Sequence, residues 1–176
     1  MDEAQTSKEW IVEALFILLR EKPLAKITVT EITKKAGVAR LTFYRNFDSK
    51  EAVIQYQSDV LFEHYLETLQ QRPRPMSLES ILQLSFDYWQ QGEETLQVMI
   101  HNELTPMLEQ SFRQYLTTIV ASFPEFQQFT HAQQYFIIGG MVQVLIDWLG
   151  HGAKPAADRM VQEILAIFNQ DKIYRA

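Results

Sequence analysis

The stretch Ile27–Lys50, ITVTEITKKAGVARLTFYRNFDSK, decides the fold class of this 176-residue chain. Thr28 and Glu31 have the spacing of a capping box, and Gly37 supplies the left-handed residue that ends a helix, so a short helix is expected between them. A second short helix is expected over residues 39–44. Two short helices joined by a glycine turn, with basic and aromatic residues on the second, are typical of a helix-turn-helix that binds DNA.

Helical periodicity and helix-ending residues continue through the rest of the chain. The first helix is expected over 6–21, where Pro23 ends it, and Asp48 is expected to cap a long helix that ends near residue 70. Arg72–Pro75 is the best internal break. Further helices are expected over 77–91, 93–102, 108–122, 130–149 and 156–169. The pattern contains no convincing strand, so we predict an all-α chain of about nine helices, with an N-terminal domain over 1–50 and a C-terminal domain over 51–176.

Charge is distributed unevenly along the chain, whose formal net charge is −6. Residues 22–50 contain seven basic and two acidic residues, whereas residues 51–176 contain seven basic and fifteen acidic residues. A basic segment in an acidic chain is the electrostatic footprint of a DNA contact, although a solvated cluster of surface charges has the same composition. Its coincidence with the helix-turn-helix pattern favours DNA.

Several classes of protein do not fit this composition. The absence of cysteine excludes disulfides and thiolate zinc sites and is typical of a reducing cytoplasm. The longest uncharged apolar run, 136–146, has 11 residues, and no secretion leader is recognisable, so we expect a cytoplasmic protein that does not enter a membrane. The four histidines are far apart and no catalytic motif is present, so we expect no enzyme, no metal site and no cofactor.

The residues expected to contact DNA follow from the helix pattern. Arg40 is suited to a bidentate contact with guanine, worth about 1–3 kcal/mol of discrimination, but a phosphate clamp fits its position equally well. Thr28 and Lys50, each at the start of a helix, suit phosphate contacts, and Thr28 can cap its helix at the same time. The complete predicted set is Thr28, Thr30, Arg40, Leu41, Thr42, Tyr44, Arg45, Asn46 and Lys50.

A set of residues at fixed spacing carries a resemblance to a known family. It consists of Thr28-Val29, Ile32, Ala36-Gly37-Val38, Thr42-Phe43-Tyr44, Phe47 and Lys50-Glu51. This pattern, over about 45 residues from Lys8 to Val53, resembles the N-terminal domain of the TetR family of bacterial transcriptional repressors. Two positions depart from it. Ala39 stands where serine is common, which weakens the helix cap by about 1 kcal/mol, and Asn46 stands where histidine is common.

The resemblance implies that the C-terminal domain forms a homodimer and holds an inducer pocket. The C-terminal half also resembles the C-terminal domain of TetR regulators from Firmicutes, through Tyr135-Phe136, Gly139-Gly140, Trp148-Leu149 and Gly152. Gln143 departs from that group, in which its position is often small.

The segment 135–149 is apolar on nearly every side, so we expect its helix to be buried all round. Gly139 and Gly140 each cost such a helix about 1 kcal/mol, which close approach of another backbone would explain. A two-fold interface of four helices, formed with the last helix, would bury both helices, while burial in the core of a single chain is the alternative. The predicted interface is Phe136, Gly139, Gly140, Val144, Trp148, Met160, Ile164 and Phe168.

The middle helices offer aromatic residues mixed with a few polar ones. Such a lining suits an aromatic or amphipathic small molecule, although aromatic residues at helical spacing also form plain core. Gln143, within an apolar helix, requires a ligand, a partner chain or a carbonyl as its hydrogen-bonding partner. The predicted ligand-contacting set is Phe62, Tyr65, Phe86, Trp89, Met99, His101, Asn102, Tyr115 and Gln143.

Together these features predict a homodimeric regulator that binds a pseudo-palindromic operator in double-stranded DNA, with half-sites about one helical turn, or slightly more, apart. A repressor is expected, although an activator needs the same DNA contacts. An unidentified small-molecule inducer would favour a conformation in which the two DNA-reading helices of the dimer are too far apart to fit the operator. The helix that begins near Lys50 would transmit this change from the pocket to the DNA-binding domain. The alternative is a helical adaptor that recruits a partner protein and binds DNA weakly or not at all.

Overall fold

A computed structural model describes residues 3–168 of the chain, and the all-α prediction is confirmed. Within that range there are nine α-helices and no strand. The helices are α1 (Glu3–Leu19), α2 (Val29–Ala36), α3 (Arg40–Asn46), α4 (Lys50–Gln70), α5 (Leu78–Gln91), α6 (Glu93–His101), α7 (Thr105–Ser122), α8 (His131–Gly150) and α9 (Ala157–Phe168). Two 3₁₀ turns, η1 (Leu24–Lys26) and η2 (Pro124–Phe126), were not expected from the periodicity. No helix of the described range is long and apolar enough to cross a membrane.

The chain divides into two compact units. The first comprises Met1–Phe62 and Val98–Ser111, and the second comprises Glu63–Gln97 and Phe112–Ala176. The helices α4, α6 and α7 therefore each contribute residues to both units. The predicted boundary between a DNA-binding domain and a C-terminal domain, at residues 50 and 51, concerns function and not compactness, and it stays a prediction.

The helix ends show how local sequence sets the elements. The Thr28 hydroxyl accepts a hydrogen bond from the Glu31 amide, and the Glu31 carboxylate accepts one from the Thr28 amide, so the predicted capping box is confirmed. Gly37 ends α2 with a φ of 69°, as expected for a left-handed cap. The expectation for Asp48 is wrong. Ser49 caps α4 instead, because its Oγ accepts from the Ala52 amide at 3.1 Å, three residues along the chain.

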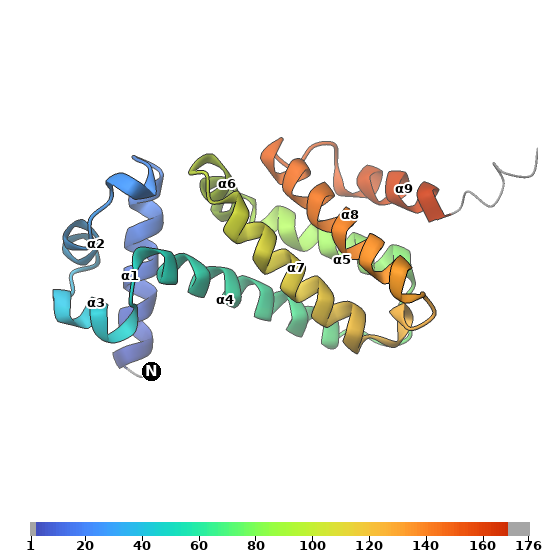
Figure 1. Cartoon of the computed structure of the whole chain (residues 1–176), viewed down its shortest axis with the longest axis horizontal. Coiled ribbons are helices and arrows are strands. Elements are labelled where there is room, and N and C mark those ends of the chain that lie inside the picture. The colour runs from blue at the N-terminus through green and yellow to red at the C-terminus, as the bar shows by residue number, and fades with distance from the viewer. Residues whose placement is uncertain (1–2, 169–176) are drawn as a thin grey trace, which may run out of the picture. The chain divides into compact units, whose positions relative to one another are not determined.

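The first unit has a core between α1, α2 and α3 (Figure 1). Ile11 and Leu15 of α1, Ile32 of α2 and Phe43 of α3 are all fully buried there. A short helix such as α3 is marginal in isolation, so this burial holds it in place.

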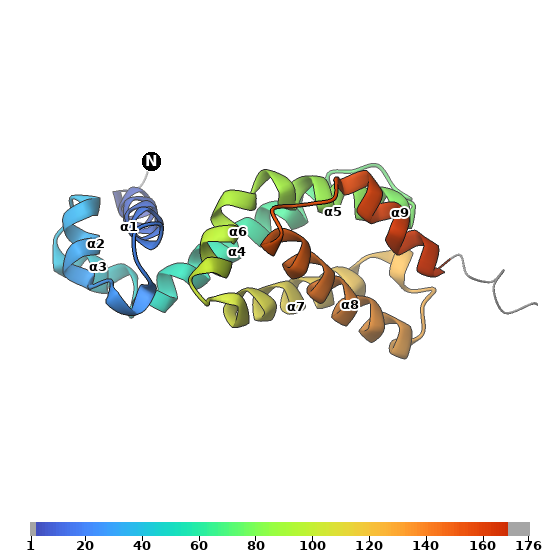
Figure 2. The ribbon, with the colours of Figure 1, turned by 90° about the horizontal axis from the view of Figure 1, so that it is seen from above.

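The second unit is centred on aromatic rings and includes α5 packed along α9, side by side in Figure 2. The Phe86 ring meets the edge of Trp148 with centroids 4.9 Å apart, and Trp89 meets Phe112 in the same manner at 4.9 Å. Edge-to-face pairs of this kind contribute about 0.5–1.5 kcal/mol beyond the area they bury.

A polar clamp ties the loop before α5 to η2 within the second unit. Glu125 accepts hydrogen bonds from the Arg74 guanidinium at 2.6 Å and from the Met76 amide at 3.0 Å, and the Met76 bond, followed by that of Arg74, lowers the pKa of its carboxyl. The Arg74 guanidinium also lies over the Phe123 ring, 4.0 Å from its centroid. The segment Arg72–Pro75, predicted as an internal break, is thus a loop held in place by hydrogen bonds to Glu125.

Candidate DNA-binding interface

In the helix-turn-helix, one face of α3 is buried against the core of the first unit and the opposite face is exposed to solvent. Phe43 is fully buried, and its ring lies 6.1 Å from that of Phe47, which in turn meets Tyr56 of α4 at 5.6 Å. Leu41 is 80 % exposed and Tyr44 is 46 % exposed. This separation of buried and exposed faces leaves the outer side chains of α3 free to meet a ligand as large as a DNA groove.

The exposed face of α3 combines charge, hydrogen-bonding groups and one aliphatic side chain. The members of the predicted set that are exposed here are Arg40, Leu41, Tyr44 and Arg45, while Thr42 and Asn46 are half-buried. The Arg40 guanidinium donates to the Tyr44 hydroxyl at 3.3 Å and lies 5.6 Å from the centre of its ring. This pair restricts the rotamers of Arg40 before any contact is made, which reduces the entropy lost on binding.

Asn46 and Ala39 show what the two departures from the family pattern do. The Asn46 amide donates to the Thr42 carbonyl at 2.7 Å, so it closes the last turn of α3. Ala39 occupies the N-cap position with an extended backbone and no side-chain hydrogen bond to the helix. The expected loss of a serine cap is therefore real, and α3 depends on tertiary packing.

The N-terminus of α2 is held by a charged network. The Lys22 ammonium donates to the Glu31 carboxylate at 2.5 Å, and the Thr28 hydroxyl donates to the same carboxylate at 2.9 Å. The hydrogen bond from Lys22, followed by those from Thr28, lowers the pKa of Glu31 to about 2. Thr28 and Thr30 are both exposed beside this network, so both side chains reach the surface where phosphate contacts are predicted.

Lys50 has a structural role that sequence reasoning missed. Its Nζ donates to the carbonyl oxygens of Leu24 and Ile27, each at 2.7 Å. The ammonium thus joins the start of α4 to the 3₁₀ turn that precedes α2. An ammonium has three hydrogens, so one is left for the predicted phosphate contact. The carbonyls that Lys50 bonds lie in η1 and directly after it. Because the hydrophobic periodicity of the sequence does not predict η1, it could not predict this role of Lys50.

The second unit contains an apolar cavity of about 120 Å³ between α4, α5, α7, α8 and α9. Of the nine predicted ligand-contacting residues, only Tyr65 lines it. Phe86 and Trp89 are buried in the aromatic core instead. Tyr115 is half-buried and outside the lining. Aromatic content in the sequence does not distinguish a lining residue from a packed one.

Four further residues of that predicted set belong elsewhere. Phe62, Met99, His101 and Asn102 belong to the first unit, where Phe62 and Met99 are buried and His101 is exposed. The Asn102 amide donates to the carbonyls of Leu19 and Val98 at 2.9 and 2.8 Å, so it closes the end of α1. Tyr65 is thus the one member of the predicted set that lines this cavity, and a ligand contact at the other residues stays a prediction.

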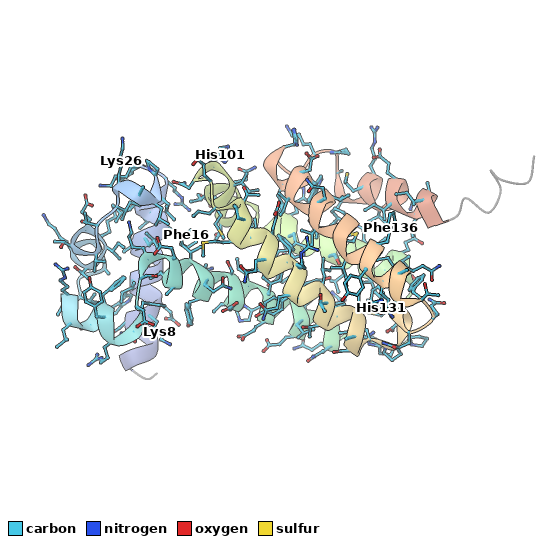
Figure 3. The ribbon with its side chains drawn as sticks, in the orientation of Figure 1. Lys8, Phe16, Lys26, His101, His131 and Phe136 are labelled. Atoms are coloured by element: carbon cyan, nitrogen blue, oxygen red, sulfur yellow. The ribbon has the colours of Figure 1, made fainter. Side chains whose placement is uncertain are left out.

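The expectation that α8 is buried all round is wrong for the single chain. Tyr135 and Phe136 are 65 % and 67 % exposed, and Gln143 is exposed rather than inside an apolar environment. Figure 3 labels Phe136 on α8. Gly140 is exposed, and a Cβ added at Gly139 or Gly140 would meet nothing within 4 Å beyond its two neighbours and the backbone of its own helix. Packing within the described part of the chain therefore gives no reason for either glycine.

The other predicted interface residues are divided between surface and core. Val144 and Met160 are half-buried, Ile164 is buried at the cavity, and Phe168 has a side chain outside the described residues. Trp148 is 1 % exposed, and its indole donates to the Pro155 carbonyl at 2.7 Å. The loop after α8 thus supplies the acceptor for the buried indole, and a place for Trp148 in a dimer interface stays a prediction.

Comparisons with known proteins bear on the first unit. Residues 11–56 match the family described as "Bacterial regulatory proteins, tetR family". Over 70 residues the chain is 39 % identical to the uncharacterized HTH-type transcriptional regulator YvdT of Bacillus subtilis, covering 39 % of this chain and 36 % of YvdT. Over 67 residues it is 39 % identical to the HTH-type transcriptional regulator EthR of Mycobacterium tuberculosis, covering 36 % of this chain and 31 % of EthR. The helix-turn-helix segment is therefore similar to the N-terminal domain of TetR-family regulators.

The match to these TetR-family relatives spans about a third of their length. Both are transcriptional regulators and not enzymes. Among solved structures, Lin0861 from Listeria innocua has a TM-score of 0.77 at 15 % identity, covering 96 % of this chain and 92 % of that one. The TetR family repressor AlkX from Dietzia has a TM-score of 0.56 at 15 % identity, covering 92 % of each chain. At such identities these structures show the shared fold alone.

Lys50 offers a test of its structural role in the TetR-type domain. We expect Lys50→Met to lower the free energy of unfolding by about 1.5–3 kcal/mol, the usual contribution of hydrogen bonds to a charged group. Lys34→Met, at an exposed position of α2, is the control and should change it little. Urea unfolding followed by circular dichroism measures both. Equal stability of the two variants would show that the Lys50 contacts do not support the fold.

The charged network around Glu31 predicts a pH dependence. Because folding lowers the pKa of Glu31 from 4.5 to about 2, its contribution to stability is present above pH 4.5 and is lost as the pH falls toward 2. We expect the melting temperature of the wild type to exceed that of Glu31→Gln at pH 7, with the difference shrinking steadily from about pH 5 to about pH 3. Glu13→Gln, at an exposed site on α1, is the matched control. A difference that does not change with pH would contradict the assignment.

Proposed function

We propose that this protein is a cytoplasmic, sequence-specific DNA-binding regulator that acts as a homodimeric repressor and is released from a pseudo-palindromic operator by a small molecule. The exposed face of α3 is the observation that carries this proposal. A helix held by the buried Phe43 presents Arg40, Leu41 and Tyr44 outward, which is what insertion into a major groove requires.

The chemistry of that face supports reading of base sequence. Arg40, ordered by its contact with Tyr44, is suited to the two acceptors of guanine. Leu41, an aliphatic side chain that is 80 % exposed, is suited to the methyl group of thymine. Thr28, Thr30 and Lys50 would set the register through phosphates.

The surface of α8 supports the homodimer. Phe136, Gly140, Gln143 and Asp147 recur at helical spacing and are all exposed. A second copy of α8 crossing at Gly139 and Gly140 would explain both glycines, since a Cβ added at either would meet nothing within 4 Å beyond its two neighbours and the backbone of its own helix. It would also cover Phe136, a large apolar side chain that is otherwise exposed to water.

The helix α4 supports a response to a ligand. It carries Lys50, which bonds the turn before α2, and Tyr65, which lines the cavity. A ligand that binds one conformation of α4 more tightly than another shifts DNA affinity only by that difference in affinity.

Selection from a random DNA library at two salt concentrations tests the proposal. We expect enrichment of a palindrome whose half-sites are about one helical turn apart, with affinity falling steeply as salt rises. A folded dimer that enriches no sequence at either salt concentration would contradict it and would favour the protein-recruiting adaptor.

Arg40→Ala provides a residue-level test. We expect it to lose about 1–3 kcal/mol of discrimination at one position of each half-site, visible as a relaxed preference in the selected sequences. Arg113→Ala removes an exposed arginine of α7 and should leave the preference unchanged. If Arg40→Ala weakens binding to all sequences equally, Arg40 is a phosphate clamp and not a base reader.

Gly140→Leu tests the interface. A Cβ at Gly140 meets nothing within its own chain, so we expect a folded protein that sediments as a monomer at concentrations at which the wild type is a dimer. Ala121→Leu, at an exposed site on α7, should not affect association. Analytical ultracentrifugation distinguishes the two, and an unchanged dimer in Gly140→Leu would place the interface elsewhere.

A further inference from the structure

The cavity in the second unit has an unusually simple lining. Among the described residues that line it, Tyr65 and Ser85 are the only ones with polar side chains, and none carries a charge. An ionised ligand would lose its hydration without gaining a partner, which costs several kcal/mol or more. The lining therefore selects against carboxylates, phosphates and ammonium groups.

The two hydroxyls have a defined hydrogen-bonding order. The Ser85 Oγ donates its one hydrogen to the Ile81 carbonyl at 2.7 Å. In its hydrogen bond with Tyr65, the Ser85 Oγ is therefore the acceptor and the Tyr65 hydroxyl is the donor. Both hydrogens are used within the protein, and what remains toward a ligand is acceptor capacity on the oxygens.

Tyr65 is held in this arrangement. Its side chain is 2 % exposed, and its ring packs against Tyr88 and Trp89 with centroids 5.1 and 5.2 Å away. Burial raises the pKa of Tyr65 well above its ordinary value, so the hydroxyl stays protonated at physiological pH. A neutral tyrosine whose hydrogen is already donated can only accept from a ligand.

We propose that the cavity binds a compact, uncharged, hydrophobic alcohol or phenol, whose hydroxyl group donates a hydrogen bond to Tyr65. This rests on the proposed ligand response and adds the chemical class of the ligand. An engineered apolar cavity of about 150 Å³ in another protein admits benzene, so about 120 Å³ suits a single ring or a short branched chain. The exposed side chain of Ile167 belongs to the lining, so the cavity reaches the surface beside it.

Three probes of similar shape separate the alternatives. The first is p-cresol, a neutral hydrogen-bond donor. The second is 4-methylanisole, in which a methyl group replaces the donated hydrogen, and the third is 4-methylbenzoate, an anion. We expect calorimetry on the purified full-length protein to give the tightest binding for p-cresol and none for 4-methylbenzoate. Equal binding of p-cresol and 4-methylanisole, a preference for the anion, or no binding of any probe would overturn the proposal.

Variants of the two hydroxyls assign the binding to this cavity. Tyr65→Phe should weaken p-cresol about three- to tenfold and leave 4-methylanisole unchanged. Tyr88→Phe, which alters a neighbouring tyrosine outside the lining, is the matched control and should change neither. Ser85→Ala removes the acceptor of the Tyr65 hydrogen and should strengthen 4-methylanisole, because that hydrogen then becomes available. If Tyr65→Phe and Tyr88→Phe behave alike, the donor does not meet Tyr65.

Operator binding is measured separately. Selective binding of p-cresol that does not release DNA would support the cavity assignment and contradict the ligand response. Release of DNA by all three probes would support a ligand response and overturn the proposed class. Calorimetry needs no DNA, so the affinities it measures test the cavity even if the protein binds no operator.

Discussion

The burial of Phe43 is the interaction on which the proposed DNA-binding face depends. With only seven residues and alanine at its N-cap, α3 lacks the length and the cap that would stabilise it alone. The full burial of Phe43 supplies that stability, and helical geometry then directs Arg40, Leu41 and Tyr44 away from the core. A reader of DNA needs a rigid helix with free outer side chains, and one buried ring provides both.

Several polar side chains serve the fold where a ligand contact was expected. Asn102 and Lys50 use their donors on main-chain carbonyls at the ends of helical segments, and the Trp148 indole does the same in the loop after α8. Carbonyls at helix ends and in loops keep acceptor capacity, which donors from distant residues use here. A buried or half-buried polar side chain is therefore evidence for a ligand site only if its role is not simply to bond a main-chain carbonyl. Tyr65 and Ser85 remain candidates because both side chains line a cavity.

The sequence predicted the helices well because they depend on local rules. Capping boxes and the left-handed Gly37 act over three or four residues, so their spacing can be read directly. The cavity could not be located in this way. It is formed by side chains from five helices, and its aliphatic members, such as Ile119 and Met141, have the same pattern as ordinary core residues. Ser49 displaced Asp48 as a cap by one position, which periodicity does not resolve.

The small cavity limits how strongly a ligand can control DNA binding, and the proposed dimer eases that limit. A ligand of about eight non-hydrogen atoms has little binding energy to divide between two conformations. Moving an equilibrium from 1:99 to 99:1 requires about a 10⁴-fold preference for one state. Two identical cavities acting on one concerted equilibrium multiply their preferences, so about 100-fold at each site is enough. Coupling two cavities through the proposed dimer would therefore let a ligand as small as a phenol operate the switch with a smaller preference at each site.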